Sequence, residues 1–111
     1  MKKLASVFAG LLLCLSTTVF SEEHLDAALE HATAAAAEGH AGKASSLVTH
    51  AKAALDHSLA ASLVAKSVPK NHIDAASKSL QEAIDHGTLN HVEPATKSAD
   101  EAVTHLQAAK K

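Results

Sequence analysis

The sequence predicts an all-α protein, an antiparallel up-down-up-down four-helix bundle made of two similar helical hairpins. Alanine, the residue with the highest helix propensity, is abundant throughout, and no segment alternates apolar and polar residues as a half-buried strand does. Three breaks interrupt the helical pattern, at Gly39–Gly42, Ser67–Asn71 and Gly87–Asn90. Because short turns favour antiparallel neighbours, these breaks indicate four helices that run alternately up and down.

The expected helices cover residues 22–38, 43–66, 72–86 and 91–109. A C-cap glycine in the Gly39–Gly42 turn ends the first of them. We expect Asn71 to cap the third helix, with Asp74 in its first turn, where acidic side chains are favoured. Asn90 and Glu93 have the spacing of a capping box at the start of the fourth helix.

The two halves of the chain repeat with a shift of 48 residues and no gap, so each half is one hairpin. Coincident pairs include His24 with His72, Gly39 with Gly87, and His57 with His105. The core is expected along one apolar stripe on each helix. The stripes are Leu25/Leu29/Ala32/Ala36, Val48/Ala51/Leu55/Leu59, Ile73/Ala76/Leu80/Ile84 and Val92/Ala99/Val103/Leu106. A core this small and rich in alanine gives only marginal folding stability without an additional cross-link, and a bound metal ion can supply one.

Residues 1–21 have the features of a cleaved export signal. Two lysines near the start precede an apolar run over residues 4–15, and Val19 and Ser21 suit a cleavage site after Ser21. The run is too short for a retained membrane anchor, which takes about 20 residues. A lipoprotein signal at Cys14 is disfavoured by the large leucine before it. We therefore expect a soluble periplasmic protein with no stable membrane insertion after cleavage.

The exported segment, residues 22–111, is one small domain whose composition excludes several functions. It keeps all nine histidines but has no Cys, Met, Phe, Tyr or Trp, and its formal net charge is −4 with histidine neutral. Disulfides, thiolate nucleophiles and cysteine-based zinc sites are therefore excluded. Without aromatic stacking residues or a basic surface, no nucleic-acid partner is expected. No phosphate-binding loop, HExxH motif or nucleophile elbow is present, so we predict no enzyme and no catalytic residues.

The histidines recur at heptad spacing, which places them in a line along one side of each helix. They are His24, His31, His40, His50, His57, His72, His86, His91 and His105. In an antiparallel hairpin, residues whose numbers have a constant sum lie at one level. We call two residues at one level a row. The rows are His24/His57 and His31/His50 in the first half, and His72/His105, Ser79/Ser98 and His86/His91 in the second. One handedness of the bundle makes the rows face each other, whereas the other turns them toward the neighbouring hairpin, and the sequence leaves this open.

Such rows predict metal sites, because helix axes about 8–10 Å apart let two imidazoles share one ion. Rows seven residues apart are separated by about 10.5 Å, so several separate small sites are expected. Glu82 and Glu101 lie one helical turn before His86 and His105 and can add carboxylate ligands. Two imidazoles with a carboxylate or water suit Cu(II) most, and then Zn(II) or Ni(II). His40, in a glycine-rich turn, is the least regular candidate ligand.

Two other classes of function remain open at this point. Single helical histidines are often plain surface residues, and protonation of nine imidazoles would change the formal charge from −4 to about +5. The alternative is therefore a pH-responsive structural or interaction protein without a dedicated metal. A metal-assisted hydrolase has no support beyond the histidines themselves.

Several runs share a heptad pattern with a known family. They are HLDAALEH at His24–His31, LVTHAK at Leu47–Lys52, IDHG at Ile84–Gly87, NHV at Asn90–Val92 and EAVTHL at Glu101–Leu106. Over essentially all of residues 22–111 the chain resembles the small metal-binding protein family. The resemblance implies a monomeric four-helix periplasmic protein that binds several divalent ions, copper foremost, for buffering, storage or detoxification. Ser79 and Ser98 replace histidines of the pattern, and Lys43 and Lys78 also depart from it, which predicts fewer or weaker sites.

Overall fold

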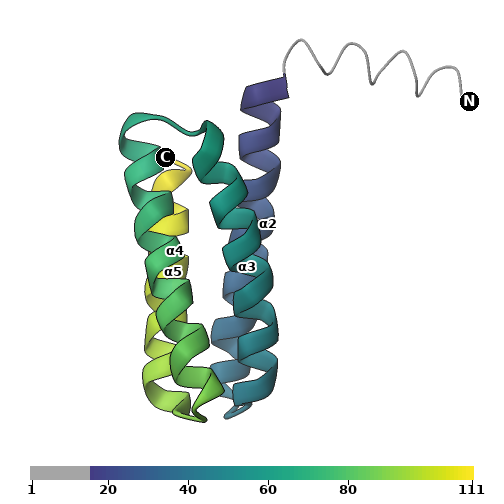
Figure 1. Cartoon of the computed structure of the whole chain (residues 1–111), viewed down its shortest axis with the longest axis vertical. Helices are drawn as coiled ribbons and strands as arrows, with labels where there is room; N and C mark the ends of the chain where they lie inside the picture. Colours follow the sequence, from purple (N-terminus) through teal and green to yellow (C-terminus); the bar gives the residue numbers. More distant parts are fainter. Residues whose placement is uncertain (1–15) are drawn as a thin grey trace, which may run out of the picture.

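The computed structural model describes residues 16–111, which form a bundle of four α-helices. The helices are α2 (Ser16–His40), α3 (Ala44–Val64), α4 (Ser67–Thr88) and α5 (Val92–Ala109). Successive helices run in opposite directions, with the α2–α3 and α4–α5 turns at one end and the α3–α4 connection at the other (Figure 1). Each helix packs on its neighbour in the chain, and α2 also packs on α5. The predicted all-α up-down bundle is confirmed.

The predicted export signal lies largely outside the described residues. These omit its lysines, its apolar run over residues 4–15 and Cys14. The predicted cleavage position after Ser21 falls within α2, which begins at Ser16 rather than at residue 22. No helix within residues 16–111 is long and apolar enough to cross a membrane.

The start of α4 differs from the prediction. The helix begins at Ser67 instead of residue 72, so Asn71 lies inside it and the predicted N-cap at Asn71 was wrong. The predicted connection over Ser67–Asn71 was also wrong, because only Ala65 and Lys66 separate the two helices. Pro69 suggested a break, but the N–H groups of a first helical turn have no intrahelical partner in any helix. A proline at that point is therefore compatible with the helix.

Two residues with positive φ form the turns at the opposite end of the bundle. Gly42 has a φ of 79° and is the glycine that ends the α2–α3 turn, whereas Gly39 lies within α2. Asn90 has a φ of 61°, a conformation that asparagine tolerates better than most residues. The predicted cap at Asn90 was wrong, since His91 occupies the N-cap position of α5 and makes no side-chain cap hydrogen bond.

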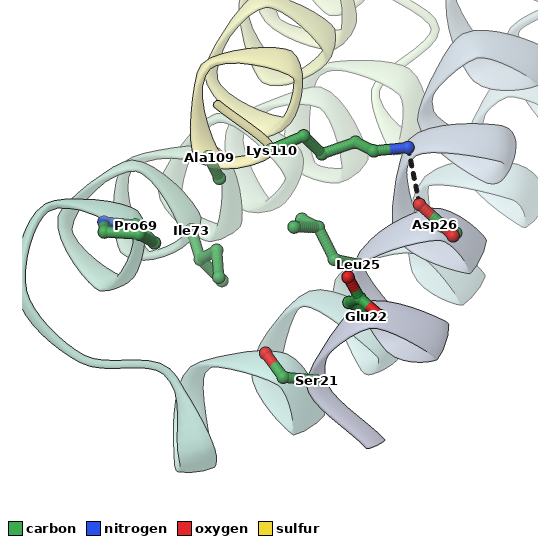
Figure 2. Close-up of a pocket in the computed structure, with 8 residues that line it drawn as sticks. All are labelled: Ser21, Glu22, Leu25, Asp26, Pro69, Ile73, Ala109 and Lys110. Atoms are coloured by element: carbon green, nitrogen blue, oxygen red, sulfur yellow. Dashed lines mark ion pairs between the residues drawn. The ribbon is translucent and has the colours of Figure 1, made fainter. Parts of the chain in front are cut away.

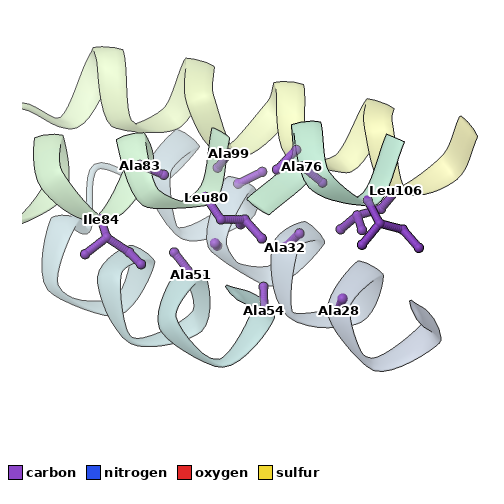
Figure 3. Packing of buried hydrophobic residues seen from close by; sticks show 14 of the residues in the cluster. Ala28, Ala32, Ala51, Ala54, Ala76, Leu80, Ala83, Ile84, Ala99 and Leu106 are labelled. Atoms are coloured by element: carbon purple, nitrogen blue, oxygen red, sulfur yellow. The ribbon is translucent and has the colours of Figure 1, made fainter. Parts of the chain in front are cut away.

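The core consists mainly of alanine and follows the 48-residue repeat closely. Figure 3 shows Leu80, Ile84 and Leu106 packed among alanines from all four helices. Repeat-related positions are buried together in both hairpins. These pairs are Leu25/Ile73, Ala28/Ala76, Ala32/Leu80, Ala35/Ala83, Ala36/Ile84, Leu47/Ala95, Ala51/Ala99, Ala54/Ala102, Ser58/Leu106 and Ala61/Ala109. The hairpins therefore have equivalent inner faces, often with a small residue in one where the other has a large one.

The inner face of α3 is rotated relative to the predicted stripe. Its buried residues are Ala44, Leu47, Ala51, Ala54, Ser58, Ala61 and Ser62. Leu59, which was predicted to be in the core, is 50% exposed, so that prediction was wrong. The fully buried Ser58 takes the inward position, where its hydroxyl donates to the carbonyl of Ile73 and contacts the Ser77 hydroxyl at 2.7 Å. A buried hydroxyl is tolerated when it is hydrogen-bonded, and apolar periodicity alone does not reveal such a position.

Candidate metal centres

Eight of the nine histidines lie in four pairs, and each pair joins the two helical segments of one hairpin. We call α2–α3 the first hairpin and α4–α5 the second. The distances between ring centroids are 5.1 Å for His24–His57, 5.8 Å for His31–His50, 6.1 Å for His72–His105 and 6.3 Å for His86–His91. These are the rows expected from constant sums of residue numbers. The bundle thus has the handedness that makes the rows face each other.

The heptad spacing explains why the pairs sit at the edge of the core. A seven-residue step returns to nearly the same side of a helix, so each histidine line keeps one position relative to the inward-facing alanines. All paired histidines except His91 are half-buried, and His91 is exposed at the start of α5. One side of each half-buried ring therefore packs against the bundle, while solvent can reach the other side.

In the first hairpin the rings of the two rows touch, although rows seven residues apart were expected to be separated by about 10.5 Å. The rings of His31 and His57 belong to different rows, yet their centroids are 5.8 Å apart and their planes differ by only 3°. Side chains of an α-helix lean toward its N-terminus, and the two helices are antiparallel. His31 on α2 and His57 on α3 therefore lean toward each other, which shortens the separation expected from the backbone.

The pair at the open end of the first hairpin is the closest of the four. The two Nδ1 atoms of His24 and His57 are 2.9 Å apart. A hydrogen bond between them requires that one nitrogen carries a proton and the other presents a lone pair. The ring of Phe20 packs edge-on against His24 with a centroid distance of 4.2 Å. Phe20 precedes the predicted cleavage position, so removal of the signal would uncover this side of His24.

The second hairpin has a gap between its two pairs. The intervening row consists of Ser79 and Ser98, which are 5% and 9% exposed and stand where the first hairpin has His31 and His50. The pairs His72/His105 and His86/His91 are two heptads apart, about 21 Å along the helix. Their rings are therefore too distant to contact one another.

The ninth histidine makes a different kind of contact. The Nε2 atom of His40 lies 3.0 Å and 3.3 Å from the two carboxylate oxygens of Asp100, and both side chains are exposed. This contact links the end of α2 to α5 and so joins the two hairpins. Row arithmetic within one hairpin could not identify Asp100, because the contact depends on how the hairpins pack together.

The carboxylates proposed as additional ligands do not complete any centre in the structure. Glu82 and Glu101 are exposed. Within residues 16–111, no three or more His, Cys, Asp or Glu side chains are grouped closely enough to hold a metal ion. Each histidine pair therefore presents two imidazoles, and further ligands would be water or side chains that change rotamer.

A pocket at the end of the bundle where α2 begins has no histidine in its lining. It lies between the start of α2, the start of α4 and the C-terminal end of α5 (Figure 2). Its lining residues are Ser21, Glu22, Leu25, Asp26, Pro69, Ile73, Ala109 and Lys110. Lys110 forms an ion pair of 2.6 Å with Asp26, which ties the C-terminus to α2. The pocket and the histidine pairs are therefore separate features of the bundle.

The fold and the pairs define a class of protein: a histidine-rich four-helix bundle that presents repeated pairs of facing imidazoles. Comparison with known families matches residues 1–109 to the family described as small metal-binding protein. The chain belongs to the small metal-binding protein family, as its heptad pattern suggested. The family is named for binding metal and not for catalysis. A comparison with curated proteins gave no match.

Proposed function

We propose that this protein binds several divalent transition-metal ions, Cu(II) foremost, one at each of its four histidine pairs. The observation that carries the proposal is the set of four facing ring pairs, with centroid distances between 5.1 and 6.3 Å. Neutral imidazole is a common ligand of copper, zinc and nickel, and at equal geometry Cu(II) binds most tightly. Residues 22–111 have no cysteine or methionine, which disfavours a site dedicated to Cu(I).

The remaining ligands would come from water and from nearby carboxylates. Glu82 and Glu101 precede His86 and His105 by four residues on the same helices, so a change of rotamer would bring each carboxylate toward its histidine. His40 with Asp100 offers one more nitrogen and two oxygens at the junction of the hairpins. We regard this contact as a weaker site than the four pairs, because it presents only one imidazole.

The proposed location is the periplasm, where a monomer with several ions would buffer, store or detoxify metal. The support is the predicted signal over residues 1–21, which has a positive start, an apolar run and a small residue at the cleavage position. Release of residues 22–111 would leave all nine histidines in the exported protein.

The direct test is a titration with Cu(II) near neutral pH of the exported protein, produced from the full-length sequence. Native mass spectrometry reports both the bound ions and the N-terminus, and the visible d–d band reports ligation. We expect saturation at about one ion per pair. The variant His72→Ala/His105→Ala should lose one ion, while Thr104→Ala, at an exposed site beside it, should lose none. Loose binding that no paired substitution reduces would contradict the proposal.

The ligand type is tested by acid. Imidazole must be neutral to bind a metal, and it is ordinarily protonated below about pH 6.5. Binding should therefore weaken below about pH 6. A stoichiometry that stays the same down to about pH 5 would show that imidazole is not the ligand.

A second candidate function, a pH-responsive protein without metal, is favoured by one contact. The hydrogen bond between the Nδ1 atoms of His24 and His57 needs an unprotonated acceptor, so acid would break it. In the presence of a chelator, a change of shape or association between neutral and mildly acidic pH would support this function. Stoichiometric metal binding at the pairs would instead favour the metal-binding function over the pH-responsive one.

A further inference from the structure

The four histidines of the first hairpin form one continuous line of rings. His24 contacts His57, His57 contacts His31, and His31 contacts His50, with centroid distances of 5.1, 5.8 and 5.8 Å. The two inner rings, His57 and His31, each have histidine neighbours on both sides. Each of them also belongs to a different two-imidazole row, so the contact between them joins two ligand pairs.

No such line exists in the second hairpin. The residues at the inner positions of the line, His31 and His57, correspond to Ser79 and His105 after the 48-residue shift. Ser79 and Ser98 are both buried, and neither can ligate as an imidazole does. The two pairs of this hairpin are therefore isolated at opposite ends, about 21 Å apart.

We propose that the first hairpin holds two metal ions as one coupled dinuclear centre, whereas the second hairpin holds its ions at two independent mononuclear sites. This inference rests on the proposed binding of one ion per histidine pair. An ion at His24/His57 and an ion at His31/His50 would be separated only by the stacked rings of His57 and His31. The two ions would therefore lie close enough to interact, both electrostatically and magnetically.

Electrostatics predicts different binding isotherms for the two hairpins. Two dications held close together repel, and the repulsion falls with distance and with screening by salt. The second ion of the first hairpin should therefore bind severalfold more weakly than the first. The two ions of the second hairpin would be separated by much more than the Debye length of about 8 Å. Each should therefore bind with an affinity that does not depend on the other.

Electron paramagnetic resonance of the Cu(II)-loaded protein tests the inference directly. Two variants of the full chain each keep one hairpin intact. His72→Ala/His86→Ala retains the line of the first hairpin, and His31→Ala/His57→Ala retains the two separate pairs of the second. Each is loaded with two Cu(II) ions per chain and diluted with Zn(II)-loaded protein, which removes coupling between molecules.

We expect a half-field transition and dipolar broadening in the variant that retains the first hairpin, and an ordinary mononuclear spectrum in the other. A gain of coupling is expected when Ser79→His/Ser98→His is added to His31→Ala/His57→Ala, because the line is then rebuilt in the second hairpin. If circular dichroism shows that this last variant is unfolded, the spectra of the two alanine variants are sufficient to test the inference.

The outcomes separate this inference from the proposed function. Two tightly bound ions with a mononuclear spectrum in the first-hairpin variant would overturn the dinuclear centre and leave metal binding at the pairs intact. Coupling of equal strength in both variants would also overturn it. Failure of both variants to bind Cu(II) would instead contradict the proposed function itself.

Discussion

The two hairpins share one heptad framework and differ in what occupies its middle row. In the first hairpin the middle row is His31 and His50, and the rings form a continuous line with the row beside it. In the second hairpin Ser79 and Ser98 fill the equivalent positions and are buried. The helices and their pairing are the same in both halves. Whether the imidazoles of a hairpin form a continuous line or two separate pairs thus depends on the two side chains of its middle row and not on the fold.

The hairpins also differ in what they contribute to the core. The large buried side chains are Leu25 and Leu47 in the first hairpin and Ile73, Leu80, Ile84 and Leu106 in the second. At the positions equivalent to these four, the first hairpin has Leu25, Ala32, Ala36 and Ser58. Four of these six large buried side chains therefore belong to the second hairpin, and truncating one of them should be among the costliest changes to the core.

The largest effect expected from this difference is the loss of a core leucine from the second hairpin. Leu80 is fully buried, and its repeat partner Ala32 is already small. Leu80→Ala should lower the free energy of unfolding of the metal-free protein by about 2–5 kcal/mol, because it opens a cavity that alanine neighbours cannot fill. Urea denaturation followed by circular dichroism measures this loss.

The control for Leu80 is Leu59, which belongs to the first hairpin and is 50% exposed. Leu59→Ala should change the free energy of unfolding by no more than about 0.5 kcal/mol, as is usual for surface positions. Equal losses in the two variants would show that Leu80 is not in the core and Leu59 on the surface as described.

The sequence was sufficient to predict the architecture and which histidines share a row, but it left open whether the rows face each other. The 48-residue repeat and the breaks near Gly42 and Asn90 determine two hairpins, and antiparallel helices place residues of constant number sum at one level. Which side of the helices faces inward required the structure. Leu59 and Ser58 are neighbours, and the inward position belongs to Ser58, whose buried hydroxyl donates to the Ile73 carbonyl.

The direction of the side chains is the other feature that the residue spacing does not predict. Constant sums of residue numbers give the level of each backbone position only. The lean of helical side chains brings the rings of His31 and His57 together from two different levels. The contact of His40 with Asp100 is a packing result between hairpins, so no spacing within one hairpin predicts it. Affinity for a particular ion depends on ligand rotamers, which neither the repeat nor the backbone determines.

The next largest effect should come from two glycines that are equivalent in the repeat. Gly39 and Gly87 are both buried within helices. A Cβ atom on Gly39 would meet both the Thr96 hydroxyl and, at 2.7 Å, the Cδ1 of Leu47, whereas one on Gly87 would meet the Cγ2 of Val48 at 2.5 Å. Overpacking of this kind costs about 1–3 kcal/mol. Alanine recovers about 1 kcal/mol through its higher helix propensity.

We therefore expect Gly39→Ala to destabilise the metal-free protein by about 1–2 kcal/mol and Gly87→Ala by less. Thermal unfolding by circular dichroism distinguishes them. Gly42→Ala is the matched comparison, because Gly42 has open space around its Cβ position and only a backbone cost from its φ of 79°. A stabilising effect of Gly39→Ala would mean that α2 and α5 separate more easily than their packing indicates.

The smallest effect concerns a carboxylate that occurs once in each half. Asp26 pairs with Lys110, whereas its repeat partner Asp74 accepts hydrogen bonds from Ser62 and Lys70. The Ser62 hydroxyl, and then Lys70, hold the pKa of Asp74 below its ordinary value of 3.8. A carboxyl group with a lowered pKa in the folded state adds stability above 3.8, and this contribution is lost as the pH falls through the folded pKa.

Asp74→Asn should accordingly cost only about 0.2–1 kcal/mol at neutral pH, because the side chain is 51% exposed and water screens its charge. The difference in melting temperature between the wild type and Asp74→Asn should shrink in acid below pH 3.8, where the carboxylate becomes protonated. Asp26→Asn serves as the comparison in the first hairpin, since it removes the link to Lys110 and leaves the contacts of Asp74 intact. A difference for Asp74→Asn that stays constant as the pH falls would show that the amide disturbs packing around Ser62 and that charge contributes nothing there.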